Sequence, residues 1–401
     1  MHMAGSKLVK TVGKLLQKLN NMPSTLSQVV VVTYLIAVIA LINSIVMVNH
    51  YGLSDRGSFA AYILYATLVG GLAVAFYEGS LFSGSISLRV LWSIPLISFF
   101  VLYIVESLIR DSDTSQIIAL SFIMLVELGN GLIVLHLLRT NTLAYNLCRA
   151  SHPVFFVCLN IMFFETKSQL NPLVVNYFLA NILTLVTGIL LLFKLRDRES
   201  KRRLDYVEKN NVESRVPGVG SFLYLARPAI MNLDKIMLER VLGSASFGGY
   251  VTISSILNIG SPVLNAIQQL GFHKMIPFFK SKNFIKVWFF SMGFGVTAII
   301  IFDVLFYGLR LKPFYYFLPL LILFSCAHHL TKHAENILIH SGRTVGIAVA
   351  KTLLLFVVGL VLIAIPISMA IVFEVVLFYF FTAVWMTVIV WREIDLRSEI
   401  Q

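Results

Sequence analysis

Ionisable side chains interrupt several apolar stretches of this sequence, and the densest group lies within residues 222–243, FLYLARPAIMNLDKIMLERVLG. Arg227 and Asp234 are seven residues apart, so a helix carries both on one face. Pro228 removes a backbone donor beside the arginine and predicts a kink there. In the simpler interpretation Arg227 snorkels to a membrane surface and Lys235 neutralises Asp234. Because Arg227 lies far from either end of the stretch, we favour a face that lines an interior cavity.

A second group lies within residues 314–340, FYYFLPLLILFSCAHHLTKHAENILIH. As a helix it carries a titratable stripe on two adjacent faces, the first with His328, Lys332 and Glu335 and the second with His329 and His333. His329 and His333 have the spacing of a metal-binding pair, but Lys332 between them would repel a cation, so we predict no metal. The simpler interpretation is a helix end exposed to water, which accounts for Glu335 better than for His328.

Two more stretches place polar groups in apolar surroundings. Glu127 lies near the middle of residues 117–138, where a lone carboxylate pairs with a cavity cation, binds a proton or cation, or is buried against a neighbouring helix. A polar face suited to hydroxyl-rich ligands follows in a later stretch, with Asn258, Asn265, Gln268 and Gln269. Arg149 lies at the entrance of another apolar stretch and is a further candidate for the same interior.

Composition defines the elements that must position these groups. The 401 residues are 58% hydrophobic and 13% charged, whereas soluble domains carry about 25% charged residues. Apolar runs recur at the length of about 20 residues that a helix needs to cross a bilayer. We therefore predict an all-α polytopic membrane protein of about twelve transmembrane helices, at 28–48, 58–80, 90–109, 116–138, 148–165, 173–193, 219–241, 246–272, 284–308, 313–339, 345–366 and 369–391.

The distribution of Lys and Arg predicts the orientation and the division of the chain. One set of connections carries most of the basic residues, which predicts that both termini are cytoplasmic and that the net charge of +12 faces anionic lipid rather than nucleic acid. The longest polar stretch lies near the middle of the chain. We expect a basic N-terminal segment at 1–27, an N-lobe at 28–193, a cytoplasmic linker at 194–218, a C-lobe at 219–391 and a cytoplasmic tail at 392–401.

A short frame recurs near the start of each predicted half, SFAAY at 58–62 and SFGGY at 246–250. The copies are 188 residues apart, each follows the first helix of its half, and both lie on the outer side, which predicts a parallel repeat. We expect the small residues after Phe to allow close backbone approach, and Tyr62 and Tyr250 to lie at the membrane interface.

Soluble-enzyme signatures are missing from the sequence. There is no phosphate-loop pattern, no GxSxG, no GxGxxG after a strand and no helical HExxH, which argues against an ATP-driven pump within this chain. The three cysteines lack metal-like spacing, and the N-terminus has no small-residue cleavage site, so we predict no metal, no disulfide framework and no signal peptide. No cofactor is expected.

The stretch 224–279 resembles the polysaccharide flippases, the Wzx-type O-antigen translocases of the MATE-like (MOP) superfamily. Those proteins have a mid-span Asp in a polar seventh helix, then a short turn, then a helix ending before a Pro; here these are Asp234, Leu242-Gly243, Gly249-Tyr250 and Pro277. The first half echoes the pattern with NHYGLSDRGSFAAY at 49–62. The first helix lacks charges, so this copy carries none of the polar function.

The resemblance implies two six-helix lobes in a V shape that alternate access to a central lumen in a bacterial inner membrane. It implies a flippase that moves an undecaprenyl-pyrophosphate-linked oligosaccharide to the outer leaflet, with a polymerase and a chain-length regulator as possible partners beside membrane lipids. Arg227, Lys235, Lys332 and Arg149 would bind the pyrophosphate. Asn258, Asn265, Gln268 and Gln269 would face the sugar. Coupling to H⁺ or Na⁺ would use Asp234, Glu127, His328, His329, His333 or Glu335.

Two alternatives stay open from the sequence. An ion-coupled drug exporter of the MATE type would need acidic groups in the lumen without a competing cationic set. A membrane polysaccharide polymerase or glycosyltransferase would place a long outer loop between helices, and no predicted outer connection here is long. We therefore expect a transporter and not an enzyme.

Overall fold

Helices make up nearly all of the structure, a computed structural model that describes residues 24–82, 88–109, 114–162, 172–199, 228–261, 283–340, 358 and 367–398. Six long helices come first along the chain: α2 (Ser24–His50), α3 (Gly52–Phe82), α4 (Leu88–Ile109), α5 (Thr114–Thr140), α6 (Thr142–Met162) and α7 (Pro172–Glu199). The later elements are α10 (Leu233–Val241), α11 (Ser244–Leu257), a 3₁₀ turn at Asn258–Gly260, α14 (Asn283–Phe302), a π-helical turn at Asp303–Tyr307, a 3₁₀ turn at Lys312–Phe317, α15 (Leu318–His340) and α17 (Met369–Ser398).

Seven of the described helical segments are long and apolar enough to cross a membrane. They are Val31–His50, Gly52–Tyr77, Gln116–Leu137, Pro172–Leu195, Ile285–Tyr307, Lys312–Ala334 and Met369–Arg392, and a shorter apolar helix covers Ser93–Ser107. The prediction of a polytopic, all-helical chain is thus confirmed in its coarse form. The count of twelve, the two lobes, the domain boundaries and the orientation stay predictions, because the eleventh span and the central linker fall largely outside the described residues.

Two predicted helices differ from their observed form. The seventh span, predicted as one helix over 219–241, is broken in its described part, because the helical turn at residues 228–231 ends at Asn232 and α10 begins at Leu233. The Asn232 side chain donates to the Pro228 carbonyl oxygen at 3.0 Å, and its backbone (φ −111°, ψ 11°) leaves the helical region. In its described part the eighth span, predicted over 246–272, is α-helical to Leu257 and then tightens into the 3₁₀ turn Asn258–Gly260.

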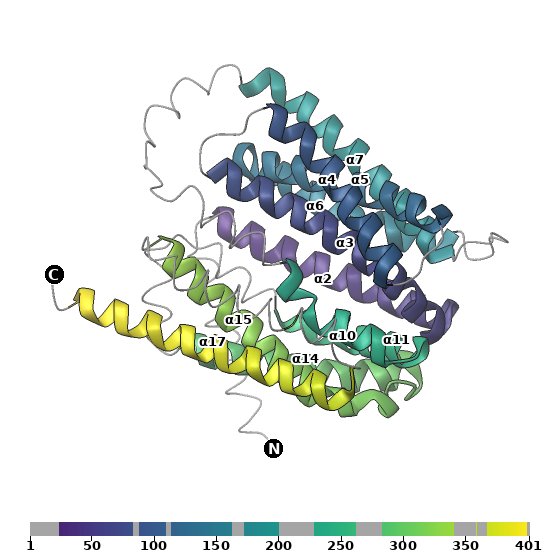
Figure 1. The fold of residues 1–401 in the computed structure, drawn as a ribbon, viewed down its shortest axis with the longest axis vertical. Helices are drawn as coiled ribbons and strands as arrows, with labels where there is room; N and C mark the ends of the chain where they lie inside the picture. The colour runs from purple at the N-terminus through teal and green to yellow at the C-terminus, as the bar shows by residue number, and fades with distance from the viewer. Residues whose placement is uncertain are drawn as a thin grey trace.

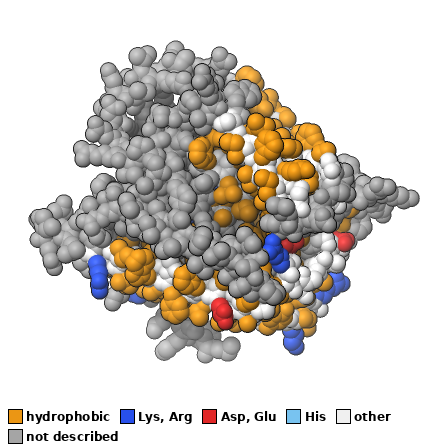
Figure 2. Space-filling model, in the orientation of Figure 1, with side chains coloured by type: hydrophobic (Ala, Val, Ile, Leu, Met, Phe, Trp, Pro, Cys, Tyr) orange, Lys and Arg blue, Asp and Glu red, His pale blue; other side chains and the backbone are white. Residues whose placement is uncertain are grey.

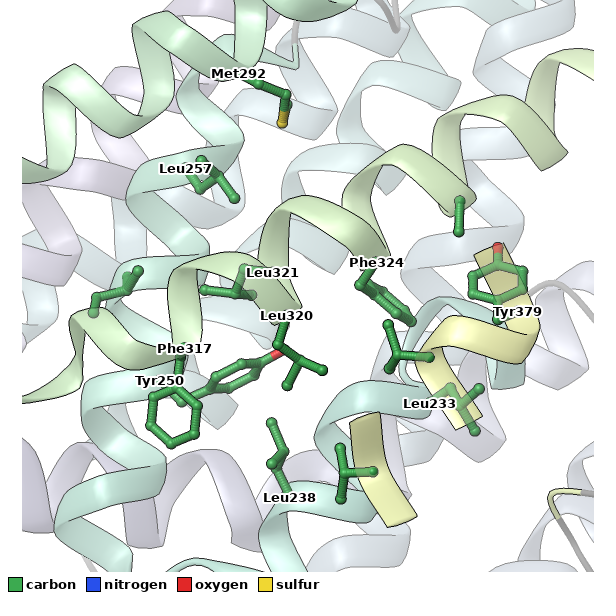
Figure 3. Packing of buried hydrophobic residues seen from close by; sticks show 14 of the residues in the cluster. Leu233, Leu238, Tyr250, Leu257, Met292, Phe317, Leu320, Leu321, Phe324 and Tyr379 are labelled. Carbon is green, nitrogen blue, oxygen red and sulfur yellow. The ribbon is translucent and has the colours of Figure 1, made fainter. Parts of the chain in front are cut away.

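Figure 1 shows the long helices running roughly side by side, with α3 to α7 on one side and α14, α15 and α17 on the other. The larger hydrophobic core joins α10, α11, α14, α15 and α17, and Figure 3 shows its centre, where Tyr250, Phe317, Leu321 and Phe324 pack. A second core joins α3, α5, α6 and α7 around Phe59 and Met124. Burial of these apolar side chains supplies most of the packing that holds the helices.

The hydrophobic surface fits the membrane assignment. Hydrophobic side chains cover most of the described surface visible in Figure 2, and charged side chains are few there. Large side chains such as Phe289, Phe290 and Phe381 are exposed on α14 and α17. In water such extended apolar surface would drive aggregation, whereas in a bilayer it contacts lipid.

Helices α3 and α11 meet backbone to backbone at the two copies of the repeated frame. A Cβ atom added to Gly57 would lie 1.8 Å from the Ser244 carbonyl oxygen, and one added to Gly248 would lie 1.9 Å from the Leu53 carbonyl oxygen. The contact is therefore reciprocal and requires glycine on both helices. The prediction of close backbone approach near the frame is met at Gly248. Tyr250, by contrast, is not at a lipid interface as predicted, because its side chain is fully buried.

Candidate functional site

The candidate site is a cavity of about 980 Å³ that eight helices and the turn after α11 enclose. The wall comprises Thr33 on α2, Thr67 and Gly70 on α3, Glu127 and Asn130 on α5, Tyr145 and Arg149 on α6, Asn181 on α7, Asp234 and Lys235 on α10, Ser254 and Asn258 at the end of α11, and Phe324, His328, His329 and Lys332 on α15. Residues more than 200 positions apart therefore share one polar chamber. The chamber is large enough for a ligand well beyond a single ion.

Among the residues that the structure describes, three cations line the cavity, and two of them are held by neutral groups. The Arg149 guanidinium donates through Nη1 to the Tyr145 hydroxyl at 3.2 Å, and its Cζ lies 5.2 Å from the centroid of the same ring. The Lys235 ammonium donates to the Asn232 side-chain oxygen at 3.2 Å. Lys332 lies on the α15 wall and is half-buried. Since a tyrosine or an amide cancels no charge, Arg149 and Lys235 keep theirs.

Two carboxylates line the same cavity, and each accepts a hydrogen bond from a tyrosine. The Tyr177 hydroxyl on α7 donates to Glu127 on α5. The Tyr250 hydroxyl on α11 donates to Oδ2 of Asp234, whose Oδ1 has no partner although the side chain is only 2% exposed. Glu127 is half-buried, and its hydrogen-bond partner lies on the neighbouring helix α7.

Neutral polar groups fill the wall between the charges. Asn130 donates through Nδ2 to both the backbone oxygen and the side-chain oxygen of Asn181, at 3.0 Å and 3.1 Å, which joins α5 to α7. The backbone acceptor fixes which end of the Asn130 amide carries the nitrogen. Asn258 is exposed on the cavity wall, and Ser254 and Ser261 line it from the same segment. Amides and hydroxyls of this kind suit hydrogen bonding to hydroxyl groups of a ligand.

The structure brings together many, but not all, of the residues predicted for the site. Arg149, Lys235, Lys332, Asn258, Asp234, Glu127, His328 and His329 all line the cavity. His333 lies on α15 but is buried at 1% exposure and is not part of the wall. Arg227, Asn265, Gln268 and Gln269 lie outside the described residues, as does the side chain of Glu335. The described residues contain no group of His, Cys, Asp and Glu that could hold a metal ion.

Several residues of the site and its surroundings were not predicted from the sequence. Tyr145 precedes Arg149 by four residues, one helical turn, so the pair could have been found from spacing alone. Asn181 and Thr67 lie in apolar stretches with nothing nearby that indicates a site. Tyr177 and Tyr250 were indistinguishable from interfacial tyrosines, because their acid partners lie 50 and 16 residues away.

The chain is similar to solved structures that are described as transporters. A multidrug resistance transporter of the MATE family of the MOP superfamily, in its inward-facing conformation, superposes with a TM-score of 0.51 at 14% identity, over 91% of this chain and 96% of that chain. The outward-facing conformation of such a transporter gives 0.46 at 12% identity, over 95% and 98%. A MOP superfamily transporter from Pyrococcus furiosus, described as having a binding pocket of reverse polarity, gives 0.41 at 12% identity, over 96% and 93%.

The first of these superpositions shows that the chain has the fold of MOP superfamily transporters. No protein-family model matches the chain. No curated protein matches it either. The similarity therefore shows the fold alone, and the substrate must be inferred from the chemistry of the cavity.

Proposed function

We propose that this protein is a membrane transporter that moves a lipid-linked oligosaccharide, carried on undecaprenyl pyrophosphate, from the cytoplasmic to the outer leaflet by alternating access. The observation that carries the proposal is the cavity, in which the hydrogen bonds of Arg149 and Lys235 within the described part of the chain go to neutral side chains. Lys332 adds a third cation to the same wall. A chamber of this charge, lined also by amides and hydroxyls, suits a ligand that combines phosphate with sugar.

The chemistry of the two cations fits a pyrophosphate. A guanidinium has five N–H donors, and within the described part of the chain Arg149 makes one hydrogen bond, to the Tyr145 hydroxyl, so the planar fork can bind phosphate oxygens. A lysine ammonium acts as a point charge that adapts to the position of the anion. Transfer of an anion through a bilayer without such charges is strongly unfavourable. The lipid tail would remain in the bilayer while the headgroup occupies the cavity.

The other assignments are part of the same proposal. Asn258 lines the cavity where a sugar would lie, and Arg227, Asn265, Gln268 and Gln269 are proposed from the sequence alone. Coupling to H⁺ or Na⁺ would use the titratable groups of the wall, Glu127, Asp234, His328 and His329, with His333 and Glu335 beside them on α15. The bacterial inner membrane, cytoplasmic termini, and a polymerase and chain-length regulator as partners are proposed with the flippase activity.

A drug exporter of the MATE type is the second candidate, and the two cavity carboxylates favour it. Glu127 and Asp234 could attract a cationic compound, as the acids of such an exporter must. Both carboxylates are engaged by tyrosine hydroxyls, however, whereas Arg149 and Lys235 retain free charge. The two functions therefore differ in the sign of the ligand that the cavity binds.

The test of the proposed function is the sidedness of the lipid-linked oligosaccharide in cells that depend on this protein. We expect Arg149→Gln to leave the lipid-linked unit on the cytoplasmic face and to slow its export at least tenfold, because a charge-assisted hydrogen bond contributes about 1.5–3 kcal/mol. Arg227→Ala is expected to act in the same direction. The matched control is Arg310→Gln, since Arg310 is exposed in a turn outside the cavity.

Three results are informative. Cytoplasmic accumulation in Arg149→Gln, with normal membrane levels and normal export in Arg310→Gln, supports the flippase. Normal export in Arg149→Gln contradicts the assignment of this residue to the pyrophosphate. Loss of resistance to cationic drugs, with normal export of the oligosaccharide, would select the drug exporter instead.

A further inference from the structure

We propose that Tyr177 and Tyr250 are positioning residues that hold the two cavity carboxylates away from the cavity cations, so that Arg149 and Lys235 stay charged and available for an anionic ligand. The proposal rests on the function proposed above, because it concerns the binding of a phosphate-bearing substrate. It assigns a role to two tyrosines, of which Tyr250 is fully buried and Tyr177 half-buried.

The first pair joins α5 to α7. Glu127 lines the cavity and accepts a hydrogen bond from the Tyr177 hydroxyl, and no cation among the described residues pairs with it. The Tyr177 ring is itself held by aromatic neighbours, with centroid distances of 5.1 Å to His152, 5.4 Å to Phe156 and 5.6 Å to Phe59. Because these rings fix Tyr177, the hydroxyl is a rigid anchor for the carboxylate.

The second pair joins α10 to α11. Tyr250 is fully buried and donates to Oδ2 of Asp234, and its ring packs edge-on against Phe317 at 5.3 Å, which Figure 3 shows. Asp234 and Lys235 are neighbours in the chain and their charges interact, but the hydrogen bonds of their charged ends go to different partners. The ammonium donates to Asn232, which lies where the helix breaks before α10. The break therefore gives Lys235 a neutral acceptor and leaves Asp234 to the tyrosine.

At both pairs a tyrosine hydroxyl donates to a cavity carboxylate, and this affects how strongly the nearby cations can bind a phosphate. Two opposite charges within about 4 Å attract strongly in surroundings of low dielectric constant. An arginine or lysine that is already neutralised by a carboxylate binds a phosphate less well, because the carboxylate must be displaced or the phosphate must approach a negative charge. A tyrosine O–H donated to each carboxylate satisfies it without consuming a cation.

Arg149 is the cation that a released Glu127 would reach. Both side chains line the cavity, and the helices that carry them, α5 and α6, pack against each other. Arg149 is tethered to its own helix through Tyr145, one turn away, which holds the guanidinium in the wall without cancelling its charge. Replacing Tyr177 by Phe removes only the hydroxyl, so Glu127 is then free to seek Arg149.

The experiment is a double-mutant cycle on the full-length protein purified in detergent. Binding of farnesyl pyrophosphate is measured by calorimetry, with inorganic pyrophosphate as a probe of the headgroup alone. We expect Tyr177→Phe to weaken binding about tenfold, and Glu127→Gln alone to tighten it, because it removes a negative charge from the cavity. The double variant Tyr177→Phe/Glu127→Gln should recover at least the affinity of the unmodified protein.

A second cycle and a matched control accompany the first. Tyr250→Phe and Asp234→Asn form the equivalent cycle at Lys235, and we expect the same weakening and the same recovery. The control is Tyr315→Phe, because Tyr315 donates to the buried carboxylate of Asp303 at 2.7 Å and neither residue lines the cavity. Its loss removes a tyrosine–carboxylate bond of the same kind and should not change the affinity for either probe.

The outcomes separate this proposal from the function on which it rests. If the unmodified protein binds neither probe, the proposed function is contradicted, and this inference with it. If it binds the probes and Arg149→Gln weakens binding, but Tyr177→Phe does not, only the positioning role is wrong. Weak binding that Glu127→Gln fails to restore would show that Tyr177 acts on the fold. If Tyr177→Phe does not fold, a weaker affinity in Glu127→Gln alone overturns the proposal by itself.

Discussion

The contact between α3 and α11 makes a sharp prediction about two glycines. Replacing Gly57 by Ala places a Cβ 1.8 Å from the Ser244 carbonyl oxygen, whereas ordinary contact begins near 3.4 Å. The neighbouring atom is backbone, so no side chain can turn aside. The two helices must therefore move apart by about 1.6 Å, the difference between these two distances, or the segment must bend.

The magnitude follows from two opposing effects. Alanine is favoured over glycine within a helix by about 1 kcal/mol. Overpacking a close contact costs about 1–3 kcal/mol, and a clash between two backbones belongs at the upper end of that range. We expect Gly57→Ala to destabilise the protein by about 2 kcal/mol, and Gly248→Ala to do the same, since its Cβ would lie 1.9 Å from the Leu53 carbonyl oxygen.

The assay is thermal unfolding of the purified protein in detergent, with Gly293→Ala as the matched control. Gly293 is also within a helix, α14, but nothing lies within 4 Å of an added Cβ. We expect Tm to fall by several degrees in Gly57→Ala and to stay level or rise in Gly293→Ala. Because one separation of the helices relieves both clashes, the double variant should lose less than the sum of the single losses. Equal Tm values for Gly57→Ala and Gly293→Ala would refute the reasoning.

Two further predictions concern buried polar groups. Asn160 on α6 donates to Asn43 on α2 at 2.8 Å and accepts from Asn176 on α7 at 3.0 Å. Because such a bond contributes about 0.6 kcal/mol, Asn160→Leu should destabilise the protein by about 1 kcal/mol and lower Tm. An unchanged Tm would show that these two hydrogen bonds do not stabilise the packing of the three helices. Arg56 is 3% exposed, its Nε has no hydrogen-bond partner among the described residues, and its other nitrogens donate to Ser255 and Met47. Because a buried charge without an opposite charge is costly, Arg56→Met should raise Tm. A lower Tm would mean that the contacts with Ser255 and Met47 outweigh the cost of the buried charge.

Hydropathy was enough to predict most of the long helices, because each must supply about 20 apolar residues whatever its neighbours are. The break at Asn232 was not predictable in the same way. Pro228 is the evident helix breaker in that stretch, yet the described backbone is helical at 228–231 and departs four residues later, where Asn232 bonds back to the Pro228 carbonyl. A side chain that competes for backbone hydrogen bonds leaves a weak trace in sequence.

The cavity, like the helices, was predictable from the sequence only in part. The cost of an ionisable group within a membrane indicated an interior position for Glu127, Asp234, Lys235 and Lys332, because that cost applies to each residue by itself; all four line the cavity. Which acid meets which partner depends on how the helices pack. The simpler interpretation of the sequence had Lys235 neutralise Asp234, whereas in the structure the Lys235 ammonium donates to Asn232 and Asp234 accepts from Tyr250.

These pairings bear on the two candidate functions more directly than the number of charges does. Glu127 and Asp234 have the same formal charge as the acids of a cation exporter, and a count of residues alone would leave the cavity nearly balanced. Each of the two accepts a hydrogen bond from a tyrosine hydroxyl, while Arg149 and Lys235 donate to neutral partners. The donors that Arg149 and Lys235 keep for a ligand are cationic, and the electrostatic argument favours an anion such as a pyrophosphate.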